Sequence, residues 1–293
     1  MSEVVLQLLP VLAGAAYAAS AIYSKRATVE GGGLWRVTFL TNWGLALALM
    51  PLLGLAEGPL RVVDWWNAGV TSIVFFAGQL MVFGALRYGE VSVVTPVMGV
   101  KVLVVAAMAV GIAQERLPER WWWAAVIAAA AAALLGAGRM EDRRRVWIGI
   151  AGGLGGAVAY SGVDICFQLW AGAAGLWRFT AMVLLLMAVW SLALLPRLEG
   201  PFWRMPRAVW HSYVHSLWLS LVQVVVMAYC VVALKGAAWA NLLYSSRGVW
   251  SVVMVWGFGS FFGNSEGAMG GGVMLRRLMG SALLLGAIAL VLV

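Results

Sequence analysis

The feature that most constrains the fold is a series of ten apolar runs of about 20 residues, each long enough to cross a bilayer as a helix. The runs cover residues 5–23, 35–56, 67–86, 91–113, 121–138, 147–169, 176–195, 209–233, 238–261 and 274–293. Only 11% of the residues are charged, whereas soluble domains carry about 25%. The chain therefore has too few polar residues to cover a surface in water. An all-α polytopic membrane protein with ten transmembrane helices is predicted.

Composition excludes several other classes of protein. The net charge of +8 does not indicate nucleic-acid binding, because the bases are scattered over short loops without a basic stripe of interleaved aromatic residues. The two cysteines, Cys166 and Cys230, lie inside apolar runs and are expected to be structural thiols. We expect no cofactor and no metal site.

The two halves of the chain resemble each other. The segment Gly33-Leu-Trp-Arg-Val-Thr38 recurs as Gly175-Leu-Trp-Arg-Phe-Thr180, and a basic connection at 139–145 separates the two copies. Residues 1–145 and 146–293 are each expected to form a five-helix repeat. Because five is an odd number of spans, the second repeat enters the membrane in the opposite sense. Such inverted repeats are typical of secondary transporters.

A basic residue lies in the middle of one apolar run in each half. Lys101 is near the centre of 91–113, where a charge costs about 2.5–3.5 kcal/mol on insertion scales. Arg247 occupies the matching position in 238–261, and a Met and a Gly follow both bases at equal spacing. We expect the two bases to approach one cavity from opposite sides. They either bind a carboxylate or phosphate of a substrate, or they are structural charges paired with Asp164 or with backbone carbonyls.

Asp164 is the acid expected closest to these bases. It lies in the run 147–169, with Tyr160 and Gln168 one turn away on either side. It is either a counter-ion to a central base or a proton carrier. Other polar side chains inside the runs are candidate substrate contacts or helix–helix hydrogen bonds. These are Tyr17, Tyr160, Gln79, Gln223, Asn241 and Tyr244. Pro96 is expected to kink the helix that carries Lys101.

Three further features have less specific interpretations. Arg36 and Arg178 begin apolar runs, and we expect their side chains to extend towards the membrane interface. His211 and His215 lie four residues apart without an acidic or Cys companion and are expected to be interfacial residues. The segment Gly263–Gly267 matches G-x-S-x-G but lacks the strand and helix of a nucleophile elbow, so we do not predict an enzyme.

Several motifs resemble the ten-span EamA type of the drug/metabolite transporter superfamily. They are Ser92-Val-Val-Thr-Pro96, Gly111-Ile-Ala-Gln-Glu115, Gly263-Asn-Ser-Glu-Gly267 and the arginines Arg36 and Arg178. The resemblance implies ten helices, a central cavity, alternating access and a place in the bacterial inner membrane. Lys101 departs from the EamA pattern. It resembles instead the bases that sugar-phosphate translocators, a related branch, carry on their fourth and ninth helices.

The function predicted from these observations is secondary-active transport of a small metabolite that bears a carboxylate or phosphate, with proton coupling or exchange. An amino-acid or zwitterion exporter of the same fold is the alternative. A membrane-embedded enzyme and a non-transporting scaffold are alternatives from other classes.

Overall fold

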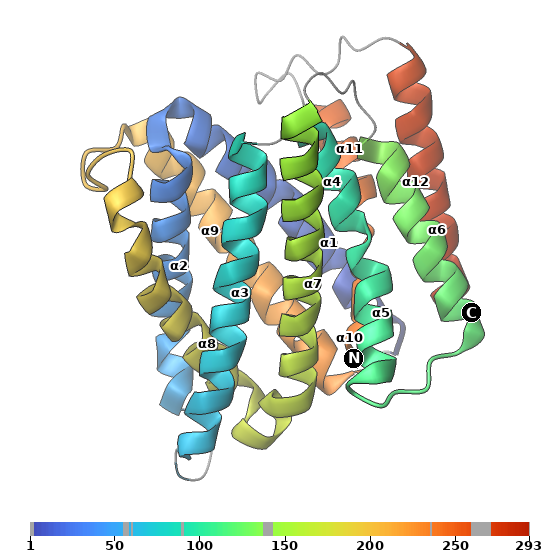
Figure 1. Ribbon diagram of the computed structural model, residues 1–293, viewed down its shortest axis with the longest axis horizontal. Helices are drawn as coiled ribbons and strands as arrows, with labels where there is room; N and C mark the ends of the chain where they lie inside the picture. Colours follow the sequence, from blue (N-terminus) through green and yellow to red (C-terminus); the bar gives the residue numbers. More distant parts are fainter. Residues whose placement is uncertain are drawn as a thin grey trace.

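The structure, a computed structural model, describes residues 3–54, 59, 61–88, 91–136, 143–234, 236–258 and 271–292. These residues form helices and short turns, with no strand among them. Each predicted apolar run falls on one helix or on two consecutive helices (Figure 1). The prediction of an all-α fold is therefore confirmed over the described ranges.

The helices follow one another with short connections. Those of the first half are α1 (Glu3–Ala27), α2 (Leu34–Leu49), α3 (Val62–Tyr88), α4 (Val91–Gly99), α5 (Lys101–Gly111) and α6 (Glu119–Gly136). Those of the second half are α7 (Arg143–Ala174), α8 (Leu176–Ser191), α9 (Arg207–Ala233), α10 (Gly236–Tyr244), α11 (Arg247–Phe258) and α12 (Gly271–Leu292). Short helical turns at Thr28–Gly32, Met50–Gly54 and Leu192–Arg197 adjoin α1, α2 and α8.

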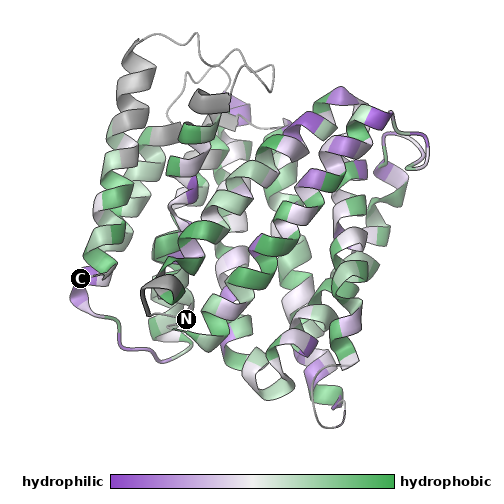
Figure 2. Cartoon of the chain, turned by 180° about the vertical axis from the view of Figure 1, so that it is seen from behind, coloured by the Kyte–Doolittle hydropathy of each residue, from purple (hydrophilic) through white to green (hydrophobic). Residues whose placement is uncertain are grey.

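Five helical stretches within the described residues are long and apolar enough to cross a membrane. They are Leu34–Gly54, Val62–Tyr88, Arg143–Ala174, Leu176–Arg197 and Arg207–Ala233. Hydrophobic residues cover most of the helix lengths, and hydrophilic residues gather at several loops and helix ends (Figure 2). This distribution suits a protein surrounded by lipid along its helices and by water at both ends.

Helices of one half pack against helices of the other. The first helix of each half runs along the third helix of the opposite half, α1 with α9 and α7 with α3. At opposite sides of the bundle, α2 lies beside α8 and α6 lies beside α12 (Figure 1). The two halves are therefore interlocked rather than side by side.

Small residues bring α7 close to its neighbours. A Cβ atom at Gly152 would lie 2.5 Å from the Cβ atom of Ala85 in α3, and one at Gly153 would lie 2.9 Å from a methyl group of Val97 in α4. Both distances are too short for a side chain. The small residues Gly152 and Gly153 thus form a packing face of α7.

Two helices in corresponding positions of the halves are interrupted. Between α4 and α5 the interruption is at Val100, and between α10 and α11 it is at Ser245 and Ser246. Pro96 was expected to produce the kink, but it lies within α4, four residues before the interruption. Lys101 and Arg247 are the first residues of α5 and α11, so each base begins the second part of an interrupted helix.

Candidate functional site

A cavity of about 540 Å³ lies between the two halves. Its charged lining residues are Lys101 from the first half and Asp164 and Arg247 from the second. Several aromatic residues of both halves also line it, and its other walls are largely aliphatic. The aromatic residues are Tyr17, Phe75, Phe83, Tyr160, Phe167 and Tyr244. The fold thus gathers residues from distant parts of the chain around one partly open cavity.

Lys101 and Asp164 form an ion pair across this cavity. The Nζ atom of Lys101 is 2.7 Å from Oδ2 of Asp164, and the two side chains are 11% and 17% exposed. The amide of Asn241 donates to the same Oδ2 over 2.8 Å and to the carbonyl of Ala237 over 2.9 Å. The pairing that the sequence offered as one alternative for Lys101 is therefore present, and Asp164 is held by two donors.

Arg247 has different surroundings. Its guanidinium carbon lies 5.1 Å from the ring centroid of Tyr17 and 5.1 Å from that of Tyr244. These two rings meet edge to face at 5.9 Å. Cation–π contacts of this kind stabilise a positive charge without neutralising it. In the described part of the chain, Arg247 forms no direct ion pair with a carboxylate, and its nearest recorded partners are the two tyrosines and, through a longer-range electrostatic interaction, Asp164.

Of two further predicted site residues, Tyr160 lines the cavity and Gln79 does not. Tyr160 packs edge to face against Phe75 at 5.7 Å. The amide of Gln79 exchanges two hydrogen bonds with the amide of Asn42 in α2, over 2.9 and 3.1 Å. Of the two alternatives for Gln79, the helix–helix hydrogen bond is therefore the one present.

Gln168 lies at the end of α7, in contact with a loop of the first half. Its Nε2 donates to Oε1 of Glu115 over 2.6 Å, and its Oε1 accepts from the backbone N–H of Ala237 over 2.8 Å. Glu115 closes the Gly111–Glu115 motif and follows α5. Burial raises the pKa of the Glu115 carboxyl, and the bond from Gln168 opposes that rise. The motif therefore joins the end of α5 to the start of α10, a role that spacing alone did not reveal.

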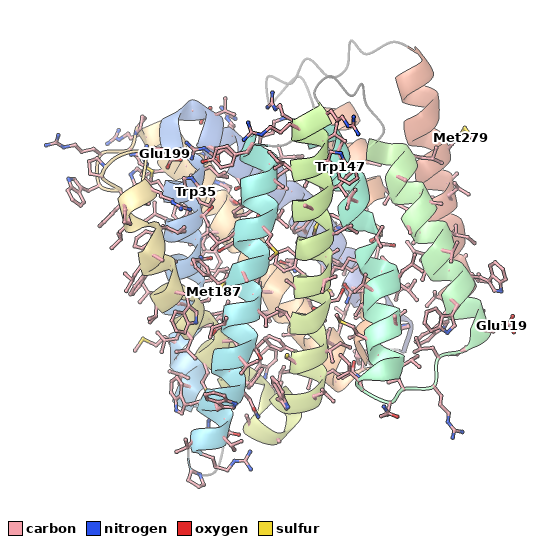
Figure 3. The ribbon with its side chains drawn as sticks, viewed as in Figure 1. Trp35, Glu119, Trp147, Met187, Glu199 and Met279 are labelled. Atoms are coloured by element: carbon pink, nitrogen blue, oxygen red, sulfur yellow. The ribbon has the colours of Figure 1, made fainter. Side chains whose placement is uncertain are left out.

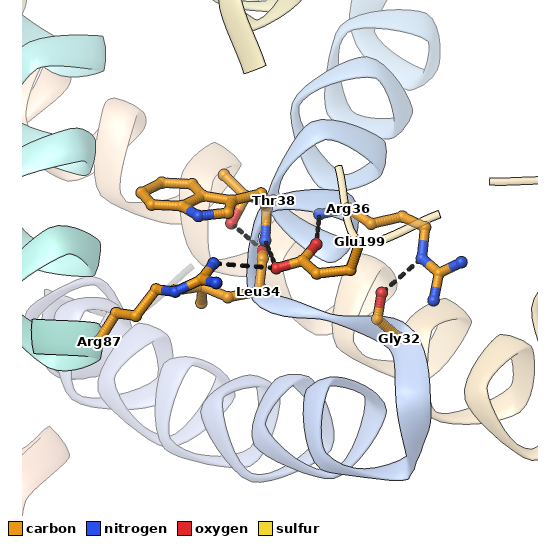
Figure 4. A network of polar contacts seen from close by, with 7 residues as sticks. Gly32, Leu34, Arg36, Thr38, Arg87 and Glu199 are labelled. Carbon is orange, nitrogen blue, oxygen red and sulfur yellow. Dashed lines mark hydrogen bonds and ion pairs between the residues drawn. The ribbon is translucent and has the colours of Figure 1, made fainter. Parts of the chain in front are cut away.

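Glu199 makes a second polar junction, at the end of the bundle where Trp35 also lies (Figure 3). Its carboxylate accepts hydrogen bonds from the backbone N–H groups of Trp35 and Arg36, over 3.2 and 3.1 Å. Arg87 of α3 donates to it over 3.2 Å and lies above the Trp35 ring (Figure 4). Glu199 therefore caps the N-terminus of α2 and ties α3 to the loop before α9. No motif or spacing in the sequence marks this residue as a contact.

Arg36, in the first turn of α2, has a buried side chain. Its side chain is only 5% exposed, and its Nε donates to the carbonyl of Gly32 over 2.5 Å. Other donors of the same guanidinium reach the carbonyls of Gly31 and Pro201. Arg178 is likewise buried. Both arginines are therefore covered by protein atoms, and their extension towards the membrane interface stays a prediction.

The two histidines contact each other and an aromatic ring. The rings of His211 and His215 are 4.3 Å apart, and Tyr23 stacks on His215 at 5.2 Å. Across the described residues, no group of three or more His, Cys, Asp or Glu side chains could hold a metal ion. The G-x-S-x-G segment at Gly263–Gly267 lies outside those residues.

The long apolar helices are those of an integral membrane protein, and the cavity lies between its two halves. The sequence profile of the EamA-like transporter family matches residues 6–137. The family resemblance is thus confirmed over these residues, and the EamA-like transporter family belongs to the drug/metabolite transporter superfamily. The protein's partners are therefore the lipid bilayer and a small-molecule substrate.

Comparison with solved structures extends the match to the whole fold. A crystal structure described only as that of a protein superposes with a TM-score of 0.72 at 19% sequence identity, covering 99% of this chain and 96% of the other. At that identity the likeness concerns the fold alone. Comparison with curated proteins found no match.

Proposed function

We propose that the protein is a secondary-active transporter of a small anion-bearing metabolite, located in the bacterial inner membrane. It has ten membrane spans, arranged as two inverted five-helix repeats at residues 1–145 and 146–293, and it works by alternating access. The observation that carries the proposal is the position of Lys101 and Arg247. Each half contributes one base to the same cavity, and each base follows the interruption of a helix.

Two features of the fold support the inverted repeat. The packing of α1 with α9 and of α3 with α7 is reciprocal, as a twofold axis in the membrane plane requires. The interruptions at Val100 and at Ser245–Ser246 occur in the fourth predicted span of each half. Interrupted helices in corresponding positions of two repeats are the usual place of a transporter's substrate site.

The chemistry of the cavity favours an anion. Two bases face one acid there, and the first turns of α5 and α11 add the positive ends of two helix dipoles. A guanidinium binds a carboxylate or phosphate through two parallel hydrogen bonds. Asp164 is the counter-ion of Lys101 and also the acid that a proton would neutralise, so proton coupling, if it operates, passes through this residue.

The experiment that tests the proposal measures from which side the cavity is reached. Ser245 lines the cavity, and Ser245→Cys would be introduced with Cys166→Ala and Cys230→Ala. A membrane-impermeant maleimide is then applied to right-side-out and to inside-out vesicles. Alternating access predicts labelling from both sides, because each conformation opens the cavity to one of them.

Ser191→Cys in the same background is the matched control. The Ser191 and Ser245 hydroxyls both donate to a carbonyl three residues earlier, over 2.6 Å, but Ser191 is fully buried outside the cavity. It should stay unlabelled from either side. If the cysteine at position 245 also stayed unlabelled, a sealed scaffold would explain the fold better than a transporter.

A further inference from the structure

We propose that the transported ligand is an organic monoanion with an aromatic or otherwise apolar body, and that its anionic group binds Arg247 rather than Lys101. This inference rests on the proposed function and names the class of ligand for the same cavity. The inference rests on three observations. They are the ion pair of Lys101 with Asp164, the N–H donors of Arg247, and the aromatic and aliphatic side chains that line the cavity.

The net charge of the side chains that line the cavity indicates the charge of the ligand. Among the described residues that line the cavity, Lys101 and Arg247 are positive and Asp164 is negative, which gives these side chains one net positive charge. A monoanion neutralises that charge. A dianion such as a phosphate ester would bring a second negative charge into a site of low polarity, where an uncompensated charge is strongly unfavourable.

Asp164 is already occupied. Its Oδ2 atom lies 2.7 Å from the Lys101 ammonium and 2.8 Å from the Asn241 amide. Because the single negative charge of Asp164 is already paired with Lys101, the ammonium group of a zwitterion would have to share this acid with that base. The site therefore disfavours amino acids, which need an acid and a base that are both free.

Arg247 keeps N–H donors for a ligand, because its side-chain hydrogen bond with Tyr244 uses only part of the five-donor guanidinium. Tyr17 and Tyr244 contact the guanidinium through their rings, at 5.1 Å from the centroids. Ring contacts hold the side chain in place without neutralising its charge. A planar fork of N–H donors, held in place before binding, suits a carboxylate or sulfonate with two oxygens in reach.

The walls indicate the body of the ligand. The cavity volume of about 540 Å³ is much larger than one carboxylate group and is typical of pockets for drug-sized molecules. Phe75, Tyr160 and Phe167 line it with aromatic surface. An apolar body removes this surface from water, whereas a small inorganic anion would leave it exposed.

The test compares four probes that share one benzene ring, by thermal unfolding of the purified full chain at mildly alkaline pH. Benzenesulfonate is a permanent monoanion, phenyl phosphate is a dianion, phenylalanine is a zwitterion and benzenesulfonamide is neutral. We expect benzenesulfonate to bind about tenfold more tightly than each of the others, the difference of one charge-assisted hydrogen bond.

Variants of the arginine locate the site. Arg247→Gln should weaken benzenesulfonate binding about tenfold or more, and Arg247→Lys should weaken it less, because it keeps the charge and loses the fork. Arg204→Gln is the matched control, since Arg204 is an exposed arginine of the loop before α9. It should leave binding unchanged.

The results separate the two proposals. Tighter binding of phenyl phosphate or phenylalanine would overturn the monoanion inference and leave a transporter in place. Unchanged benzenesulfonate binding by both Arg247 variants would overturn the role of Arg247. Binding of none of the charged probes would contradict the anion site itself, and with it the proposed function.

Discussion

The Nζ atom of Lys101 in α5 lies 2.7 Å from Oδ2 of Asp164 in α7, so a base of the first half and an acid of the second are joined across the cavity. Both groups are largely buried, and each depends on the other for compensation of its charge. The pair thereby fixes the relative position of α5 and α7. It also leaves Arg247 as the cavity cation without such compensation.

Removing one member of this pair should be more harmful than removing both. Asp164→Asn leaves a buried ammonium without its counter-ion and should lower the free energy of unfolding by about 3–5 kcal/mol. Lys101→Met combined with Asp164→Leu should lose clearly less than either single variant. Denaturant unfolding in detergent measures all three. Additive losses in the double variant would show that the two charges are not coupled.

Gln79 should matter for stability and not for substrate binding. Gln79→Leu breaks the reciprocal amide contact with Asn42 and should cost about 1 kcal/mol of unfolding free energy. Because Gln79 is not part of the cavity lining, the KM of a transported anion should not change. Gln223→Leu, which alters the lining, is the comparison and should change KM. If KM changed in the Gln79 variant and not in the Gln223 variant, Gln79 would be a substrate-binding residue.

Glu199 should contribute more to stability than its ion-pair partner does. Arg87→Ala removes a half-exposed ion pair worth about 0.2–1 kcal/mol. Glu199→Ala also removes the cap of α2, which is worth about 0.5–2 kcal/mol more. A double-mutant cycle measured by thermal unfolding separates the two contributions. Equal losses in the two single variants would contradict the capping role.

The Glu115 junction should make stability depend on pH. Burial raises the pKa of Glu115 above its usual 4.5, so the folded protein holds this proton more tightly than the unfolded chain does. Stability should therefore fall as the pH rises from 4.5 through the raised pKa, because the folded state then loses its excess proton.

The measurement is Tm against pH for the parent and for two variants. Glu115→Gln keeps an acceptor for Gln168 and removes the titrating group. The Tm of this variant should therefore decrease less with rising pH than the Tm of the parent. Glu119→Gln changes an exposed acid four residues further on, and its Tm should decrease with rising pH as much as the Tm of the parent does. Equal slopes in all three proteins would mean that Glu115 does not titrate in this range.

The helices could be predicted from the sequence because lipid requires long apolar runs, and those runs are visible in one dimension. The ion pair of Lys101 with Asp164 could also be predicted, because buried charges require partners and few acids lie inside the apolar runs. The second helix interruption had no Pro to signal it. There, the Ser245 hydroxyl bonds to the carbonyl of Leu242, and such local bonds compete with a regular helix.

Contacts between distant segments were not predictable. The amide pair of Asn42 and Gln79 depends on how α2 and α3 are rotated about their axes, which apolar periodicity does not fix. Arg36 is expected at the interface because it begins a run, and the position of that residue does not reveal that the segment around Glu199 and Pro201 folds back over it. In each case the deciding partner is far away in sequence.

The most direct test of the anion site is counterflow in proteoliposomes. Vesicles loaded with unlabelled benzenesulfonate should take up the labelled compound in a saturable manner, with no such uptake by protein-free vesicles. Arg247→Gln should slow this uptake about tenfold or more, while Arg204→Gln should match the parent. Uptake by Arg247→Gln at the parent's rate would contradict the account, because an anion would then cross without the base to which the cavity assigns it.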